Sequence, residues 1–262
     1  MAVMTMSQAQ YSEFRSTVSD GPVPIVICSM PRAGSTLIEQ IISSHAEVTS
    51  IGEAGLATRA TQAAVAVHRL AQPLYPAWCT LPAAAAVFAS ACQGFRDNLA
   101  GHAVETARFC EKSVNNDILL GLWLLAYPEA RVVHCRRDPL DICLSCYQGY
   151  FSRGLAFSNK LTWVAERYVL HERLMAHWKR LFPAQVLTIS YEDVVNEPRG
   201  EIRRLLGFLG LPWDDACLDF HRNDNPVRSA SNWQVRQPLY QSSAHRWRQY
   251  RDQLAEILYL GG

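Results

Sequence analysis

The chain has 262 residues, of which 49% are hydrophobic, and its formal net charge at pH 7 is +1. This length permits one large α/β domain or two smaller ones, and the apolar content is sufficient for a substantial core. The near-neutral charge excludes general binding to nucleic acid or to a membrane surface, because both select for a strong excess of basic residues.

The N-terminal part of the chain predicts a helix, a strand and a second helix. Ser7–Val18 has the pattern of a short polar helix, Pro24–Met30 that of a buried strand, and Ser35–His45 that of a helix with an apolar face. The loop Pro31–Thr36 joins the strand to the second helix. A helix N-terminus that follows such a turn attracts anions, because its backbone N–H groups point outward and its dipole favours negative charge. The loop therefore predicts a ligand that carries phosphate or sulfate.

The residues of this loop differ from those of a nucleoside triphosphatase loop. That motif requires several glycines and a lysine beside the hydroxyl residue. Here Gly34 is the single glycine, and the cation is Arg32, whose planar guanidinium suits an oxyanion. A plain strand–turn–helix with a surface arginine is the alternative interpretation of the same residues.

The next segment predicts a loop and a pair of helices. Glu53 lies between Gly52 and Gly55 in a loop that follows the short apolar run Val48–Ile51. Helices rich in alanine are then expected over Leu56–Leu70 and Ala83–Leu99, with a proline-rich connection between them at Pro73, Pro76 and Pro82. We interpret residues 56–101 as a helical insert and residues 1–22 as a helical extension of a single domain, 1–262.

The second half of the chain continues to alternate strands with helices. The expected elements, in chain order, are a strand at Ala107–Glu111, a helix at Asp117–Ala126, a strand at Arg131–Cys135, a helix that opens at Asp138, a helix at Leu161–Leu181, a strand at Gln185–Ser190, a helix at Arg199–Leu209, an extended segment at Pro226–Pro238 and a helix at Ser242–Leu258. Such alternation is typical of βαβ units. The expected fold class is therefore α/β, a central parallel sheet flanked by helices.

Several cations directly follow predicted strands. Arg32, Lys112, Arg136 and Arg137 all lie at such positions. Ligands of parallel sheets bind at the carboxyl ends of the strands, so these side chains are candidates for one common site. Ser145 lies two turns into the helix after Arg137, where a hydroxyl and a guanidinium can hold a terminal phosphate together. An exposed Arg–Asp pair is the alternative for this second motif.

The cysteine and histidine patterns do not indicate a metal site. The eight cysteines are scattered, and Cys143 and Cys146 form a single C-x-x-C pair, which is better explained as two residues one helical turn apart. The histidines have no metal-ligand spacing, and His134 in its strand is expected to be a core residue. The apolar stretch Ile118–Tyr127 is too short to cross a bilayer, and Met1–Tyr11 lacks the pattern of a secretion signal. A cytoplasmic protein with free thiols is expected.

The two anion motifs and the C-terminal segments together resemble the sulfotransferases that use 3′-phosphoadenosine 5′-phosphosulfate (PAPS). The resemblance is greatest to a bacterial group whose sulfotransferase domain often follows tetratricopeptide repeats, and which is related to the tyrosylprotein sulfotransferases. It covers roughly Pro24 to Leu258 and implies a P-loop-like nucleotide-binding fold. The segments that carry it are Cys28–Ile41, Arg136–Asp141, Tyr191–Val194, Leu211–Asp214, Val227–Ser231 and Gln234–Tyr240.

The resemblance implies which residues bind the donor PAPS. The loop of Arg32 matches the site of the 5′-phosphosulfate, and Arg137 with Ser145 matches the pair that binds the 3′-phosphate. Residues farther along the chain match the region that closes over the nucleotide. The implied donor-binding residues are Arg32, Ala33, Gly34, Ser35, Thr36, Arg136, Arg137, Ser145, Ser231 and Arg236.

The resemblance also implies a reaction, the in-line transfer of a sulfonate to a hydroxyl without a metal ion. Glu53 matches the general base of the tyrosylprotein relatives, and Lys112 matches the lysine that contacts the bridging oxygen of the donor. Arg32 would neutralise the oxygens of the group in transfer. The segment around Lys112 departs from the usual Asp-Lys-Met-Pro of the family, since here it is Glu111–Val114 with the sequence Glu-Lys-Ser-Val. A surface pair between Glu111 and Lys112 is the alternative for these two residues.

Other functions and several properties stay open at this point. A nucleotide-dependent kinase of related fold is disfavoured by the missing lysine–hydroxyl pair, and a non-catalytic nucleotide-binding module by the joint presence of Arg32, Glu53 and Lys112. A histidine base is also conceivable, and we rank it below Glu53. Four classes of acceptor stay open: a phenol, an alcohol, a glycan and a peptide tyrosine. We expect Leu56–Gly101 and Tyr150–Asn159 to line its side of the site. The oligomeric state is undetermined, with a homodimer among the options.

Overall fold

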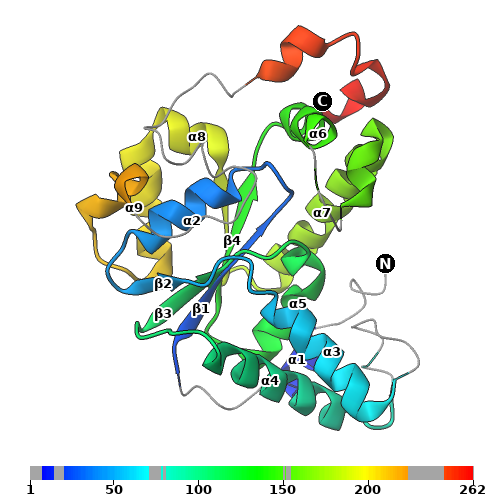
Figure 1. Cartoon of the computed structure of the whole chain (residues 1–262), viewed down its shortest axis with the longest axis vertical. Coiled ribbons are helices and arrows are strands. Elements are labelled where there is room, and N and C mark those ends of the chain that lie inside the picture. Colours follow the sequence, from blue (N-terminus) through cyan, green and yellow to red (C-terminus); the bar gives the residue numbers. More distant parts are fainter. Residues whose placement is uncertain are drawn as a thin grey trace.

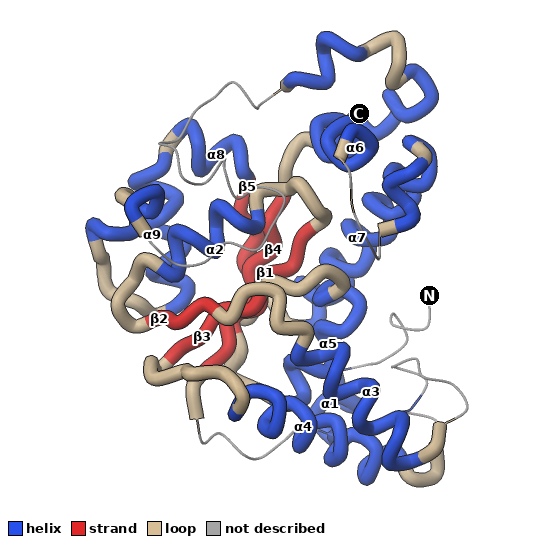
Figure 2. Tube along the Cα trace, in the orientation of Figure 1, coloured by secondary structure: helices blue, strands red, loops and turns tan. Residues whose placement is uncertain are grey.

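A computed structural model of the chain describes residues 8–14, 21–70, 78, 81–149, 151, 155–223 and 245–261. Within this part of the chain, five parallel strands form one sheet in the order β2-β3-β1-β4-β5 (Figure 2). The strands are β1 (Val23–Ser29), β2 (Val48–Ser50), β3 (Arg108–Glu111), β4 (Arg131–Arg136) and β5 (Val186–Ser190). The expected α/β class is confirmed. Because β1 is the middle strand, the loop that follows it lies between the loops that follow β3 and β4.

Helices cover both faces of the sheet (Figure 1). One face carries α2 (Ser35–Ser43), α8 (Tyr191–Asn196) and α9 (Pro198–Leu209). The other face carries α1 (Gln8–Phe14), α3 (Leu56–His68), α4 (Ala84–Ala100), α5 (Asn116–Ala126) and α7 (Leu161–Leu181). Helix α6 (Pro139–Gln148) follows β4 and packs against α7. The site region is therefore framed by α2 on one side and α6 on the other.

The central strand β1 contributes side chains to both cores because successive residues of a strand point to opposite faces. Ile25 and Ile27 pack into the cluster under α2 and α9, whereas Val26 and Cys28 pack into the cluster under α3, α4 and α5. All four are essentially inaccessible to solvent. Both ends of the loop after β1 are consequently anchored in packed layers.

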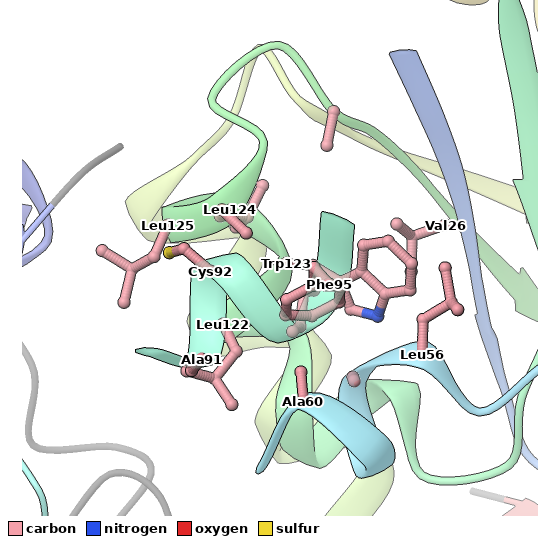
Figure 3. Close-up of a cluster of buried hydrophobic side chains, with 14 of the residues drawn as sticks. Val26, Leu56, Ala60, Ala91, Cys92, Phe95, Leu122, Trp123, Leu124 and Leu125 are labelled. Atoms are coloured by element: carbon pink, nitrogen blue, oxygen red, sulfur yellow. The ribbon is translucent and has the colours of Figure 1, made fainter. Parts of the chain in front are cut away.

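The pair α3 and α4 packs closely and rests on α5. Figure 3 shows Phe95 of α4 beside Trp123 of α5, and their ring centroids are 4.7 Å apart. A β-carbon on Gly94 would lie 3.1 Å from the α-carbon of Ala60, so glycine allows the two helices to approach at this point. The alanine-rich pattern that predicts these helices thus also supplies the small residues of their contact.

Most predicted elements are confirmed to within two residues, but strand β2, helix α8 and three short 3₁₀ helices were not predicted. Strand β2 has only three residues and lies at the edge of the sheet, where Val48 alone is buried, so it offers too short an alternation to recognise. Helix α8 has only six residues, and its N-terminus is capped by the Ser190 hydroxyl, which accepts a hydrogen bond from the Asp193 N–H.

The expected continuous helix over Ser242–Leu258 is wrong for the described residues. The segment forms two 3₁₀ helices, η6 (Arg246–Tyr250) and η7 (Ala255–Gly261). The Asp141 carboxylate of α6 accepts hydrogen bonds from the backbone N–H groups of His245 and Trp247, at 2.6 and 2.9 Å. Contacts with α6 therefore set the backbone here, in place of the periodic pattern of the segment itself. The extended segment predicted at 226–238 lies outside the described residues, as does most of the proline-rich connection.

The described cysteines are free and buried, as expected. Cys143 and Cys146 lie one turn apart in α6. Burial raises the pKa of each of these two thiols to about 12, so both are protonated and act as small apolar side chains. Among the described helices, none is long and apolar enough to span a membrane.

Candidate active site

The loop between β1 and α2 adopts a backbone that exposes the first turn of the helix. Arg32 and Gly34 both have positive φ angles, of 69° and 94°. Gly34 precedes the first residue of α2, and a β-carbon at this position would lie 2.9 Å from Cδ2 of Tyr191. Glycine is required here both by the backbone angle and by the close approach of Tyr191. The first N–H groups of α2 have no partner within the helix, so they are donors for an anion.

The two anion motifs predicted from the sequence contact each other directly. Nε of Arg32 donates to Oγ of Ser145 at 2.8 Å, and Nη1 of Arg137 donates to the backbone oxygen of Arg32 at 3.1 Å. The Arg137 guanidinium also lies over the Tyr191 ring, 4.7 Å from its centroid, and 3.7 Å from Asp141. Segments from β1, β4 and β5 thus meet at the carboxyl ends of their strands, which is where the sequence predicted the arginines to converge.

These residues line a small cavity, which we call the anion pocket. Its wall consists of Arg32, Arg137, Asp141, Leu144, Ser145, Gln148 and Arg246. Three guanidinium groups face one carboxylate, so the lining has a surplus of positive charge. Arg246 was not predicted, because it comes from the C-terminal segment. Hydrogen bonds from the backbone N–H groups of His245 and Trp247 to Asp141 hold that segment against α6, together with apolar packing.

Arg136 lies apart from this pocket. Its Nε is 3.0 Å from the Glu172 carboxylate of α7, and half of its side chain is exposed. Arg136 and Arg137 diverge because β4 ends at Arg136, where neighbouring residues project to opposite faces. The sequence grouped the two arginines, whereas the structure brings only Arg137 to Arg32.

Glu53 and Lys112, which the sequence nominated separately, form an ion pair. Nζ of Lys112 lies 2.7 Å from Oε1 of Glu53 and 3.5 Å from Oε2 of Glu39. The Lys112 N–H also donates to the Gly52 oxygen at 3.0 Å, which joins the end of β3 to the loop of Glu53. We call Glu39, Glu53 and Lys112 the carboxylate–lysine cluster.

Glu39 is a member of this cluster that the sequence did not reveal. It lies in α2 with 5% of its surface exposed, and its Oε1 accepts a hydrogen bond from Ser50 Oγ at 2.7 Å. Burial raises the pKa of Glu39, although Lys112 and Ser50 oppose the shift. Burial also disfavours the charged form of Lys112, but Glu39 and Glu53 outweigh that effect and raise the pKa of the lysine. The one sequence feature that pointed to Glu39 was the presence of a carboxylate within the apolar run Leu37–Ile42.

Glu111 has a structural role beneath the cluster. Glu111 is fully buried. Its carboxylate accepts hydrogen bonds from the Gly55 N–H at 2.9 Å and from the Asn116 side chain at 2.7 Å, and it also contacts the Ser113 hydroxyl. These bonds fix the loop of Glu53 to the end of β3. The alternative of a surface pair between Glu111 and Lys112 is therefore wrong.

The carboxylate–lysine cluster opens onto a cavity of about 510 Å³. Arg59 of α3 and His102, which follows α4, also line this cavity. Of the segment Leu56–Gly101 that was expected to border the acceptor, Arg59 lines this cavity. The cluster lies at the ends of β2 and β3, and the anion pocket at the ends of β1 and β4, so neighbouring strands place both at the same edge of the sheet.

His134 belongs to a different network, on the face of the sheet covered by α7. It is 4% exposed, and its Nε2 lies 3.2 Å from His171 Nε2 and 3.4 Å from Glu172. Burial lowers the pKa of His134, so it is neutral at pH 7. His134, His171 and Glu172 bring three ligand atoms within 4.8 Å of one another. Asp117 pairs with His171, and Arg136 pairs with Glu172. The polar atoms of these side chains therefore have partners within the protein, as expected of a hydrogen-bonded network.

Some predicted site residues lie outside the described part of the chain. These are Ser231 and Arg236, predicted to close over the nucleotide, and Tyr150, predicted to border the acceptor. Thr36, by contrast, is described, and it is buried in the first turn of α2.

A family model described as the sulfotransferase family matches residues 24–215. Among curated proteins, an uncharacterized protein of Aquifex aeolicus (strain VF5) is 33% identical over 240 residues, which are 90% of this chain and 32% of that protein. Human heparan sulfate glucosamine 3-O-sulfotransferase 6 is 33% identical over 98 residues, which are 32% of this chain and 29% of that protein. The chain thus spans a third or less of the length of these relatives.

Solved structures share the fold. The sulfotransferase domain of the Synechococcus PCC 7002 olefin synthase superposes with a TM-score of 0.65 at 21% identity, over 94% of this chain and 97% of that one. A mouse sulfotransferase complexed with PAP has a TM-score of 0.54 at 13% identity, over 98% and 89% of the two chains.

Proposed function

The chain belongs to the sulfotransferase family, and on that premise we propose that it transfers the sulfonate of PAPS to a hydroxyl acceptor. The observation that carries the proposal is the hydrogen bond of 2.8 Å between Arg32 and Ser145. It unites two motifs, far apart in the sequence, in one positively charged pocket beside a paired carboxylate and lysine. A nucleotide donor with an anionic group at each end and a hydroxyl acceptor need these two environments next to each other.

The anion pocket suits the two charged ends of the donor. The first turn of α2, from Ser35, offers N–H groups and hydroxyls to the phosphosulfate, and Arg32 adds a cation to the same end. Arg137 and Ser145 would hold the 3′-phosphate, and Arg246 offers a third guanidinium. The bound PAP of the mouse sulfotransferase supports a nucleotide of this class.

The carboxylate–lysine cluster supplies the acid–base chemistry. Glu53, the more exposed of the two carboxylates, takes the proton of the acceptor hydroxyl as the acceptor oxygen forms its bond to sulfur. The bond between sulfur and the phosphate oxygen of the donor breaks, and Lys112 neutralises the charge that develops on that oxygen. The products are a sulfate ester and 3′-phosphoadenosine 5′-phosphate (PAP).

The acceptor enters from the cavity of about 510 Å³. Its wall combines apolar residues such as Ile51 and Ala54 with the charged Arg59, so it suits a molecule that carries both apolar and polar groups. Phenols, alcohols, glycans and peptide tyrosines are all candidates, and the heparan sulfate relative adds weight to a glycan.

Ligand-induced stabilisation tests the proposal against a kinase and against a protein that binds no nucleotide. We expect PAP to raise the unfolding midpoint, because a ligand that binds only the folded state stabilises it. ATP with Mg²⁺ should have a clearly smaller effect. Stabilisation by ATP–Mg²⁺ alone, or by neither nucleotide, would contradict the assignment. An acceptor screen with labelled PAPS, resolved by mass spectrometry, then identifies the sulfated product.

A further inference from the structure

We propose that Glu39 is a positioning residue that keeps Lys112 in place when Glu53 leaves its ion pair to act as the base. The proposal rests on the function proposed above and adds a residue to its machinery. Glu39 lies on α2 and its side chain is almost fully buried, whereas Glu53 lies on the loop after β2 and its side chain is partly exposed; both line the acceptor cavity. The lysine is thus held between a buried carboxylate and an exposed one.

The geometry of the three groups shows why one carboxylate is insufficient. In the structure Oε1 of Glu53 accepts a hydrogen bond from Lys112 at 2.7 Å, so the lysine occupies the oxygen that has to meet the acceptor hydroxyl. Glu53 must therefore exchange the lysine for the acceptor hydroxyl, and it then becomes neutral as it accepts the proton. At that stage Lys112 has to contact the departing oxygen of the donor.

Without a second carboxylate, Lys112 would be poorly stabilised during this exchange. Only 7% of its surface is exposed, and burial favours loss of its proton. Glu39, at 3.5 Å, remains in place, because Ser50 donates to one of its oxygens at 2.7 Å and the Gly52 N–H donates to Ser50 at 3.2 Å. The Glu39 carboxylate is consequently fixed to the same loop that carries Glu53.

The electrostatic surroundings of Glu39 come from several elements. The end of β3 contributes Lys112, Glu111 and the buried thiol of Cys110. Ser50 is the last residue of β2, and Glu53 lies in the loop that follows it. Arg59 and His102 line the same cavity. Of these groups, Lys112 is the cation in direct contact with Glu39. Loss of the Glu39 charge should therefore be seen mainly in the protonation of Lys112.

The test compares Glu39→Gln with the wild type and with Glu47→Gln, a change of the same kind at an exposed position in the loop that follows α2. We expect Glu39→Gln to lower turnover by about tenfold to a hundredfold, the effect of a misplaced catalytic group. Its KM for PAPS should stay within about threefold, and the alkaline limb of its rate–pH profile should move to lower pH. Glu47→Gln should match the wild type.

A purely structural role of Glu39 would give a different result. The unfolding midpoint of Glu39→Gln would fall, but the alkaline limb of its rate–pH profile would stay in place. That outcome would overturn the proposal, and so would unchanged turnover. If Glu39→Gln does not fold, Ser50→Ala provides a second test, because it removes the hydrogen bond that fixes Glu39 and leaves both charges. A smaller shift of the limb in the same direction is expected, and an unmoved limb would contradict the proposal.

A direct titration separates this proposal from the proposed function. The ¹³Cε signal of Lys112 reports the protonation of the lysine without any turnover. Its midpoint should be lower in Glu39→Gln than in the wild type whether or not PAPS is the donor. An unshifted midpoint overturns the role of Glu39 alone, whereas a wild-type protein that transfers no sulfonate from PAPS overturns the proposed function alone.

Discussion

The anion pocket and the carboxylate–lysine cluster lie at the same edge of the sheet but balance their charges in opposite ways. The pocket is lined by three guanidinium groups and one carboxylate, that of Asp141, so basic side chains predominate in its wall. The cluster holds one lysine between two carboxylates, so its charges compensate one another within the protein. In the proposed function the pocket binds the donor, whereas the cluster has to exchange partners before it can act.

This difference indicates how the two regions should respond to mutation. Loss of Arg137 from the pocket should weaken the binding of a nucleotide and leave the chemical step intact. Loss of Glu39 or Glu53 from the cluster should slow the chemical step and leave nucleotide binding intact. The following variants test that separation.

The largest effect is expected for Glu53→Gln, which removes the base and keeps the shape of the side chain. Turnover should fall by about 10²–10⁴-fold, the usual contribution of a positioned base. The affinity for PAP should be unchanged, because Glu53 does not line the anion pocket. Steady-state kinetics and calorimetry measure the two quantities. Turnover near that of the wild type would remove Glu53 as the base.

Lys112→Met should destabilise the protein in a way that depends on pH. Breaking a buried ion pair costs about 3–5 kcal/mol, because the remaining charge is left without compensation. The pKa of Glu39, already raised by burial, would lose the influence of Lys112 that lowers it. The folded state then binds a proton more tightly than the unfolded state. The stability of the variant should therefore increase as the pH falls through this raised pKa toward about 4.5.

Chemical denaturation of Lys112→Met and the wild type between pH 8 and pH 5 measures this effect. The difference in unfolding free energy between the two proteins should shrink as the pH falls. A difference that stays constant over the range would show that Glu39 carries no buried charge beside Lys112.

Arg137→Ala should weaken PAP binding about tenfold to a hundredfold, since a hydrogen bond to a charged group contributes about 1.5–3 kcal/mol. Turnover at saturating PAPS should change little. Arg136→Ala is the matched control, because Arg136 pairs with Glu172. An equal loss of affinity in both variants would show that both arginines bind the nucleotide, as the sequence suggested. An unchanged affinity in Arg137→Ala would show that Arg137 does not bind it.

Gly34→Ala should destabilise the protein by about 1–3 kcal/mol through its backbone angle, with a further contribution from the contact with Tyr191. PAP binding should weaken as the loop shifts. Gly207→Ala in α9 is the control, because nothing lies within 4 Å of its added carbon, and it should be neutral or stabilising. Equal stability of the Gly34 and Gly207 variants, measured by denaturation, would contradict the strained geometry of the loop.

The sequence predicts the anion pocket better than the cluster. Arg32 and Arg137 directly follow predicted strands, so the rule that ligands bind at the carboxyl ends of parallel strands brings them together without coordinates, and Ser145 lies two turns into the helix after Arg137. The pairing of Glu53 with Lys112 depends on β2 and β3 being neighbours, and β2 was too short to predict.

The remaining parts of the site depend on packing that leaves no local pattern. Glu39 is a carboxylate in an apolar helical run, and only the position of Lys112 at the end of β3 gives it a role. Arg246 reaches the pocket because Asp141 holds the C-terminal segment against α6, where periodicity alone suggested one regular helix. Both residues became apparent through long-range contacts.

A crystal structure of the complex with PAP tests the central claim most directly, namely that the anion pocket and the carboxylate–lysine cluster form one active site. We expect the 3′-phosphate between Arg137 and Ser145, the 5′-phosphate over the first turn of α2, and Lys112 facing the latter. A nucleotide bound away from Arg32 and Arg137, or with its 5′ end directed away from Lys112, would contradict the account.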